Sequence, residues 1–109
     1  MDQDQKDILV ELKHRLAAAA PGEVCRLILF GSRAREDGRN DSDLDVAVIV
    51  RKRIPDLERR LDDAVYDLMW KHDFDPIISL KVFSEAQFDE ALKKGFPFYR
   101  SVAREGIPL

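Results

Sequence analysis

The sequence predicts an α+β domain in which a small mixed β-sheet carries helices packed on one face. Three short apolar runs of strand-like composition, at residues 24–30, 43–50 and 77–83, alternate with stretches of helical periodicity. A chain of 109 residues can bury one hydrophobic core but hardly two. Residues 1–109 are therefore expected to form a single domain.

Composition and charge narrow the classes of protein to which the chain can belong. It is 45% hydrophobic and 36% charged, as in soluble globular proteins. No apolar run approaches a membrane span, and the chain starts with polar residues, MDQDQKD, unlike a signal peptide. We therefore expect a cytoplasmic protein with no membrane contact. The net charge of −3 argues against direct contact with a long nucleic acid, which needs a basic face.

The first elements expected are a helix over residues 4–20 and a strand over residues 24–30. Apolar side chains recur on one face of the helix: Ile8, Leu9, Leu12 and Leu16. The strand is an almost unbroken apolar run, which suggests burial on both of its faces. Cys25, the single cysteine, lies at its start and is expected to be a small buried side chain.

Two aspartates open the second strand, which follows a polar loop over residues 36–42. Asp43 and Asp45 are two residues apart, so on a strand they point to the same face. Two neighbouring carboxylates repel, and an apolar strand offers them no counter-charge. Mg²⁺ would supply one, since it takes carboxylate oxygens and shares itself with substrate phosphates. The alternative is a solvated strand start whose side chains cap nearby N–H groups.

Gly31 and Ser32, at the end of the first strand, are candidates to hold a phosphate. Residues 32–35 are expected to begin a short helical turn, whose N–H groups and positive dipole end would face the anion. Arg33 and Arg35 add positive charge suited to a small anionic ligand. Alternatively, the glycine allows a positive φ in a turn and the serine caps the helix. The downstream aspartates favour the first interpretation, a nucleotide-phosphate site that contains a metal.

The second half of the chain is expected to add one strand and three helices. A helix over residues 54–71 has an apolar stripe, and Trp70 near its end is expected in the core, with contact to a partner as the alternative. Residues 84–87, SEAQ, form a capping box that opens the next helix. Residues 96–99, FPFY, begin a last short helix, and its aromatic side chains fit either a core or a protein interface.

Gly31-Ser32, followed by ten residues and then Asp43-Leu44-Asp45, resembles the signature of the DNA polymerase β-like nucleotidyltransferase superfamily. The string GSRARED…SDLDVAVIV is similar to that of its smallest members, the minimal nucleotidyltransferase (MNT) proteins, and the ending KKGFPFYRSVAREGIPL is also like theirs. Many MNT proteins are the MntA-type antitoxins of HEPN–MNT toxin–antitoxin pairs. The resemblance implies the polymerase β-like nucleotidyltransferase fold, Mg²⁺ as cofactor and a nucleoside triphosphate, ATP, as substrate.

The activity that the resemblance implies is transfer of a nucleoside monophosphate, AMP from Mg-ATP, to an acceptor hydroxyl. Asp43 and Asp45 would be the catalytic residues and the metal ligands. The nucleotide would be bound by Gly31, Ser32, Arg33 and Arg35. The chain has no room for a domain that recognises the acceptor, so a partner or a second subunit must present it. The resemblance implies a tyrosine of a HEPN toxin, and a homo-oligomer is left open.

The third strand departs from the superfamily pattern. There the superfamily usually carries a third carboxylate, which orients or deprotonates the attacking hydroxyl. The best register against that pattern places Ser79 at this point, so the third acid is absent or displaced to Asp75. Two functions therefore remain open: an antitoxin that transfers a nucleotide, and a non-catalytic MNT-fold antitoxin that acts by binding only. Modification of a small molecule is disfavoured, because the remaining residues build no acceptor pocket.

Overall fold

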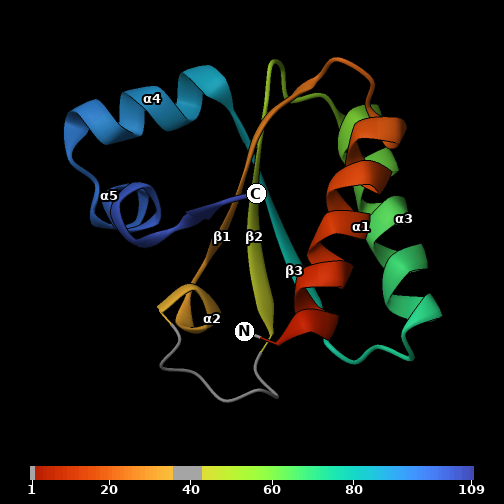
Figure 1. The fold of residues 1–109 in the computed structure, drawn as a ribbon. Helices are drawn as coiled ribbons and strands as arrows, with labels where there is room; N and C mark the ends of the chain where they lie inside the picture. The colour runs from red at the N-terminus through yellow and green to blue at the C-terminus, as the bar shows by residue number, and fades with distance from the viewer. Residues whose placement is uncertain (1, 36–42) are drawn as a thin grey trace.

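The computed structural model describes residues 2–35 and 43–109, and Figure 1 shows the path of the chain. The elements are, in chain order, α1 (Gln3–Ala19), β1 (Val24–Phe30), α2 (Ser32–Arg35), β2 (Leu44–Val50), α3 (Pro55–Lys71), β3 (Ile78–Ser84), α4 (Glu85–Lys94), α5 (Pro97–Glu105) and β4 (Ile107–Pro108). Every predicted helix and strand is present, whereas β4 was not predicted. The predicted polar loop at residues 36–42 lies outside the described residues.

The strands of the described residues form one mixed sheet in the order β3-β2-β1-β4. β1 pairs antiparallel with β2 and with β4, whereas β2 pairs parallel with β3. A parallel pair needs a crossover connection, and α3 supplies it between β2 and β3. The predicted α+β class with a small mixed sheet is confirmed.

The main core lies between the sheet and the two long helices, α1 and α3, which Figure 1 shows side by side on one face of the sheet. Every second side chain of β2 points into this core: Leu44, Val46, Val48 and Val50. The helices add Leu12, Leu16, Leu57, Leu61 and Leu68. Replacing one of these leucines by alanine would leave a cavity and cost about 2–5 kcal/mol. In the described part of the chain no helix is long and apolar enough to cross a membrane.

α4 and α5 pack against the opposite face of the sheet, as Figure 1 shows. The buried cluster on that face consists of Ile28, Ala47, Ile49, Phe83, Phe88 and Val102. Phe83 of β3 meets the ring of Phe88 at 5.9 Å and that of Tyr99 at 5.4 Å, both edge to face. Helices were expected on one face of the sheet only. α1 and α3 do lie together on one face, but α4 and α5 cover the other, so the expectation is wrong for α4 and α5. Their apolar stripes need a sheet face, and α1 and α3 already occupy the other one.

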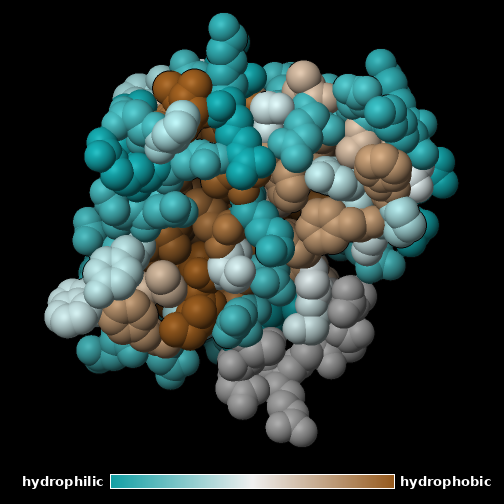
Figure 2. Space-filling model, turned by 180° about the vertical axis from the view of Figure 1, so that it is seen from behind, coloured by the Kyte–Doolittle hydropathy of each residue, from teal (hydrophilic) through white to brown (hydrophobic). Residues whose placement is uncertain are grey.

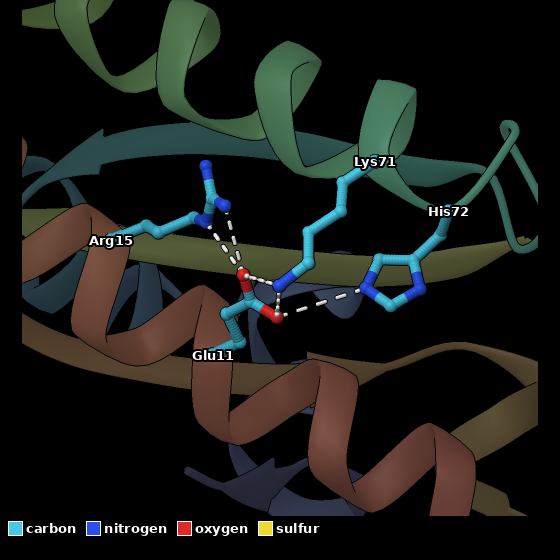
Figure 3. A network of polar contacts seen from close by, with 4 residues as sticks. All are labelled: Glu11, Arg15, Lys71 and His72. Atoms are coloured by element: carbon cyan, nitrogen blue, oxygen red, sulfur yellow. Dashed lines mark hydrogen bonds and ion pairs between the residues drawn. The ribbon is translucent and has the colours of Figure 1, made fainter.

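A polar network joins α1 to the C-terminal end of α3 (Figure 3). The carboxylate of Glu11 accepts hydrogen bonds from Lys71 Nζ at 3.0 and 3.2 Å and from Arg15 Nε at 2.9 Å. Nε2 of His72 lies 3.7 Å from the same carboxylate. The hydrogen bond from Lys71 is the largest cause that lowers the pKa of Glu11, while partial burial opposes it. The network thus fixes α1 to α3 at the end of the pair where β3 begins.

Two side chains that were expected to be buried are exposed. Cys25 lies between Val24 and Arg26, where the register of the β1–β2 pairing shifts, and its Sγ lies 3.3 Å from Glu85 Oε2. Trp70 is 68% exposed and stacks on Tyr66, with 6.5 Å between the ring centroids. The expectation of burial is wrong for both. The register shift displaces the cysteine from regular alternation, and the tryptophan lies on the side of α3 away from its leucine stripe.

Candidate active site

The end of β1 lies beside the start of β2, because the strands are antiparallel and Phe30 is the register partner of Asp45. Gly31 follows with a φ of +77°, a conformation that glycine adopts far more readily than other residues. A β-carbon added to Gly31 would lie 2.5 Å from Asp45 Oδ2. Gly31 and Asp45, which were predicted to share a site, are therefore direct neighbours, and a side chain at residue 31 would have to displace the Asp45 carboxylate.

The two aspartates differ in their surroundings. Asp43 precedes β2 and is exposed, whereas Asp45 lies on the strand and is half-buried. Leu44 and Val46, on either side of Asp45, point into the core under α1 and α3. Since side chains alternate along a strand, the Asp45 carboxylate points to the opposite face, on which α4 and α5 pack.

The electrostatics of the pair favour a bound cation. Burial is the largest cause that raises the pKa of Asp45, and the neighbouring charge of Asp43 raises it further, while Lys81 opposes them. Both raising effects would be relieved by a cation held between the carboxylates. Two carboxylates at an accessible strand end are also a donor set that Mg²⁺ uses where a substrate phosphate completes its coordination. The residues present therefore fit Mg²⁺.

Lys81 belongs to this site and was not predicted. It is the register partner of Ala47, whereas Asp45 pairs with Ser79 one step earlier along the same sheet face. The sequence held the signal, because on the predicted strand Lys81 lies two residues after Ser79 and so on the same face. Its ammonium group partly offsets the charge of Asp45.

The short helix α2 starts directly after Gly31, so the helical turn predicted at residues 32–35 is confirmed. Ser32 is half-buried at its first position. Arg33 is only 6% exposed, which removes its guanidinium from free contact with solvent. Arg35 ends the helix, and its side chain lies outside the described part of the structure. The chain thus brings Gly31 to Asp45, with Ser32 as the next residue, and encloses Arg33.

Comparison with known proteins identifies the family. The family described as "Polymerase beta, Nucleotidyltransferase" matches residues 11–101. This chain belongs to that nucleotidyltransferase family. A solved structure described as a "putative minimal nucleotidyltransferase" is 27% identical with a TM-score of 0.60, and the match covers 95% of this chain and 94% of that one. Curated proteins provide no match. The predicted polymerase β-like nucleotidyltransferase fold is confirmed.

The sequence placed Ser79 at the position where this nucleotidyltransferase family usually carries a third carboxylate, so that acid was predicted to be absent or displaced to Asp75. Ser79 is the register partner of Asp45, so a hydroxyl stands beside the half-buried aspartate. Asp75 precedes β3 and, together with Asp7 and Glu11 of α1, lines a hollow of about 380 Å³. Neither Asp43 nor Asp45 lines this hollow. Among the described residues, no set of three or more acidic, histidine or cysteine side chains could hold a metal ion. Within that part of the chain, Asp43 and Asp45 are thus a pair without a third acid.

Proposed function

We propose that this protein is a Mg²⁺-dependent nucleotidyltransferase that transfers AMP from ATP to a tyrosine of a partner HEPN toxin, and so acts as an antitoxin. The observation that carries the proposal is the close approach of Gly31 to Asp45. A side chain at residue 31 would occupy the space in which a phosphate could meet both the backbone and the carboxylate. Membership of the nucleotidyltransferase family supports the transfer. The choice of partner rests on the resemblance of the sequence to MNT antitoxins alone.

Each residue of the site has a task in this reaction. Asp43 and Asp45 hold the cation, which neutralises phosphate charge when it is bound. Gly31 and Ser32 hold the phosphates through backbone N–H groups and the hydroxyl. An acceptor oxygen forms a bond to the α-phosphorus as the bond to the pyrophosphate oxygen breaks, and the acceptor proton passes to water. Positioning and charge neutralisation are the main contributions that a protein makes to such a transfer.

A second candidate function is neutralisation of the toxin by binding alone. Ser79 favours it, because a serine hydroxyl next to Asp45 is a far weaker base than a carboxylate and would not activate an acceptor. In that case the protein covers its partner, and the nucleotide site is not needed for protection.

Intact-mass spectrometry separates the two functions. The protein is mixed with a HEPN protein from the same genome and with Mg-ATP, and the mass of each chain is recorded. We expect the partner to gain one or more AMP units with the wild-type protein and none with the Asp43→Asn/Asp45→Asn variant. Asp63→Asn, which removes an exposed acid of α3, serves as the control and should retain transfer. A stable complex without any mass gain would instead establish neutralisation by binding.

A further inference from the structure

The two edges of the sheet differ in their capacity to pair with another strand. β4 forms one edge and has two residues, the second of which is Pro108. β3 forms the other edge and has seven residues without a proline. Short strands and proline protect a sheet edge from pairing, and β3 has neither protection.

The hydrogen bonds of the sheet show which backbone groups of β3 point outward. Leu44 N–H donates to the carbonyl oxygen of Ile77 at 2.9 Å, so Ile77 directs its carbonyl toward β2. In a parallel pair, the N–H and C=O of one residue point to the same side, and successive residues alternate. The backbone groups that point away from β2 therefore belong to Ile78, Leu80 and Val82.

Among the described residues of one copy, these outward groups have little to bond with. The N–H of Ile78 meets only the sulfur of Met69, at 3.2 Å, and a thioether is a weak acceptor. The N–H and C=O groups of Leu80 and Val82 face the open edge. β3 thus offers a row of backbone donors and acceptors to another strand.

Side chains along this edge are suited to contact with protein. Ile77 is 41% exposed, and Leu80 and Val82 are half-buried. Figure 2, seen from behind, shows an apolar strip between polar flanks where Figure 1 places β3. A groove of about 330 Å³ runs along the strand, and its charged side chains are two basic and two acidic ones: Arg53, Lys81, Glu58 and Asp62. Two copies of this edge can therefore meet without a net repulsion between like charges.

We propose that two copies of the chain pair antiparallel along β3, around a two-fold axis at Leu80, and so join their sheets into one. In this register Leu80 lies opposite Leu80 of the partner subunit, and Ile78 lies opposite Val82 of the partner subunit. All three outward residues then exchange backbone hydrogen bonds, and each contact occurs twice, as symmetry requires.

The neighbouring registers are less favourable. An axis at Lys81 would set two ammonium groups directly opposite each other at the close spacing of a non-hydrogen-bonded pair. An axis at Ser79 would oppose Val82 with Pro76, which has no N–H to donate. With the axis at Leu80, Lys81 lies opposite Ser79 of the partner subunit. Each copy therefore brings its Lys81 ammonium group to the sheet face of the other copy that carries the candidate site.

Sedimentation velocity over a range of micromolar concentrations tests the dimer, with no nucleotide present. We expect the wild-type protein to form a dimer and Leu80→Pro to be a folded monomer by circular dichroism, since the lost N–H makes no bond to β2. Leu80→Asp, which sets two carboxylates opposite each other at the axis, should also be monomeric and covers the case that the proline variant fails to fold. Val10→Asp, at a side chain of α1 that is 56% exposed, is the matched control and should remain a dimer.

A cross-linking experiment tests the register. In a Cys25→Ala background, Leu80→Cys should form a disulfide between copies, because hydrogen-bonded antiparallel partners have Cα atoms about 5.5 Å apart, within disulfide range. Lys81→Cys should not cross-link to itself. A monomer at every concentration, a dimer that survives Leu80→Asp, or preferential cross-linking at residue 81 would each overturn the proposal. Because no nucleotide is used, these outcomes are independent of the transfer activity.

Discussion

Because residue 31 is a glycine, the turn between β1 and α2 can approach the carboxylate of Asp45 closely. Its positive φ and the 2.5 Å approach of an added β-carbon to Asp45 Oδ2 are separate constraints, one on the backbone and one on space. Gly22 has a similar φ of +75°, but nothing lies within 4 Å of an added β-carbon. The chain therefore contains a control in which the backbone constraint acts alone.

Gly31→Ala and Gly22→Ala should separate stability from binding. Each puts a side chain on a left-handed residue, so each should lower the free energy of unfolding by about 1–2 kcal/mol. Only Gly31→Ala displaces the Asp45 carboxylate, so only this variant should weaken Mg-ATP binding, by roughly tenfold or more. Urea unfolding and calorimetric titration measure the two effects. Equal binding by both variants would show that the contact between Gly31 and Asp45 has no part in the site.

Asp45→Asn should stabilise the protein when no metal or nucleotide is present. The substitution removes a half-buried charge and its repulsion with Asp43, while the side chain keeps its shape. We expect the Tm at neutral pH to rise by about 2–4 °C, which corresponds to roughly 0.5 kcal/mol in a domain of this size. Asp63→Asn, at an exposed acid of α3, should change the Tm much less. A fall in Tm for Asp45→Asn would mean that the carboxylate is already well paired within the protein.

At the scale of elements, the helices and strands with strong periodicity could be predicted from the sequence. The short edge strand and the exposure of individual side chains could not. The leucine stripe of α3 and the Ser84 cap of α4, whose Oγ accepts from Gln87 N–H at 3.0 Å, follow from local pattern. β4 has two residues and too little pattern to be detected. Burial of Cys25 was mispredicted because register shifts depend on the partner strand. Lys81 was not predicted because the family pattern indicates an acid on this strand and gives no role to a cation.

The contact of α1 with α3 through Glu11 should depend on pH. The lowered pKa of Glu11 means that its stabilising contribution is present above the unfolded pKa, near 4.5, and is lost as the pH falls through the lower folded pKa. Glu11→Gln should therefore reduce the free energy of unfolding by about 0.5–1 kcal/mol at neutral pH, and this difference should shrink below the unfolded pKa. Glu90→Gln, in an exposed pair with Lys94 on α4, is the matched control and should cost less. Urea unfolding of the three proteins across the acidic range measures both.

At the scale of the whole molecule, one small sheet assembles the candidate site from neighbouring strand positions. β1 delivers Gly31, β2 carries Asp45, and β3 places Ser79 and Lys81 beside it. The spacing of the GS and DxD motifs allowed the first two to be predicted, because both motifs flank apolar strands. On β3, Ser79 could be placed from the family pattern, whereas the neighbourhood of Lys81 became evident only from the parallel register with β2. In the proposed reaction the acceptor is the partner toxin, and no described residue of this chain is assigned that role.

Isothermal titration calorimetry with Mg-ATP tests most directly whether Gly31, Ser32, Asp43 and Asp45 form a metal–nucleotide site. We predict saturable binding to the wild-type protein that is abolished by EDTA and by Asp43→Asn/Asp45→Asn, and that is retained by Asp63→Asn. Binding that persists in the double variant or in EDTA would contradict a site built on these carboxylates. No binding to the wild-type protein would show that the nucleotidyltransferase fold here no longer holds a nucleotide.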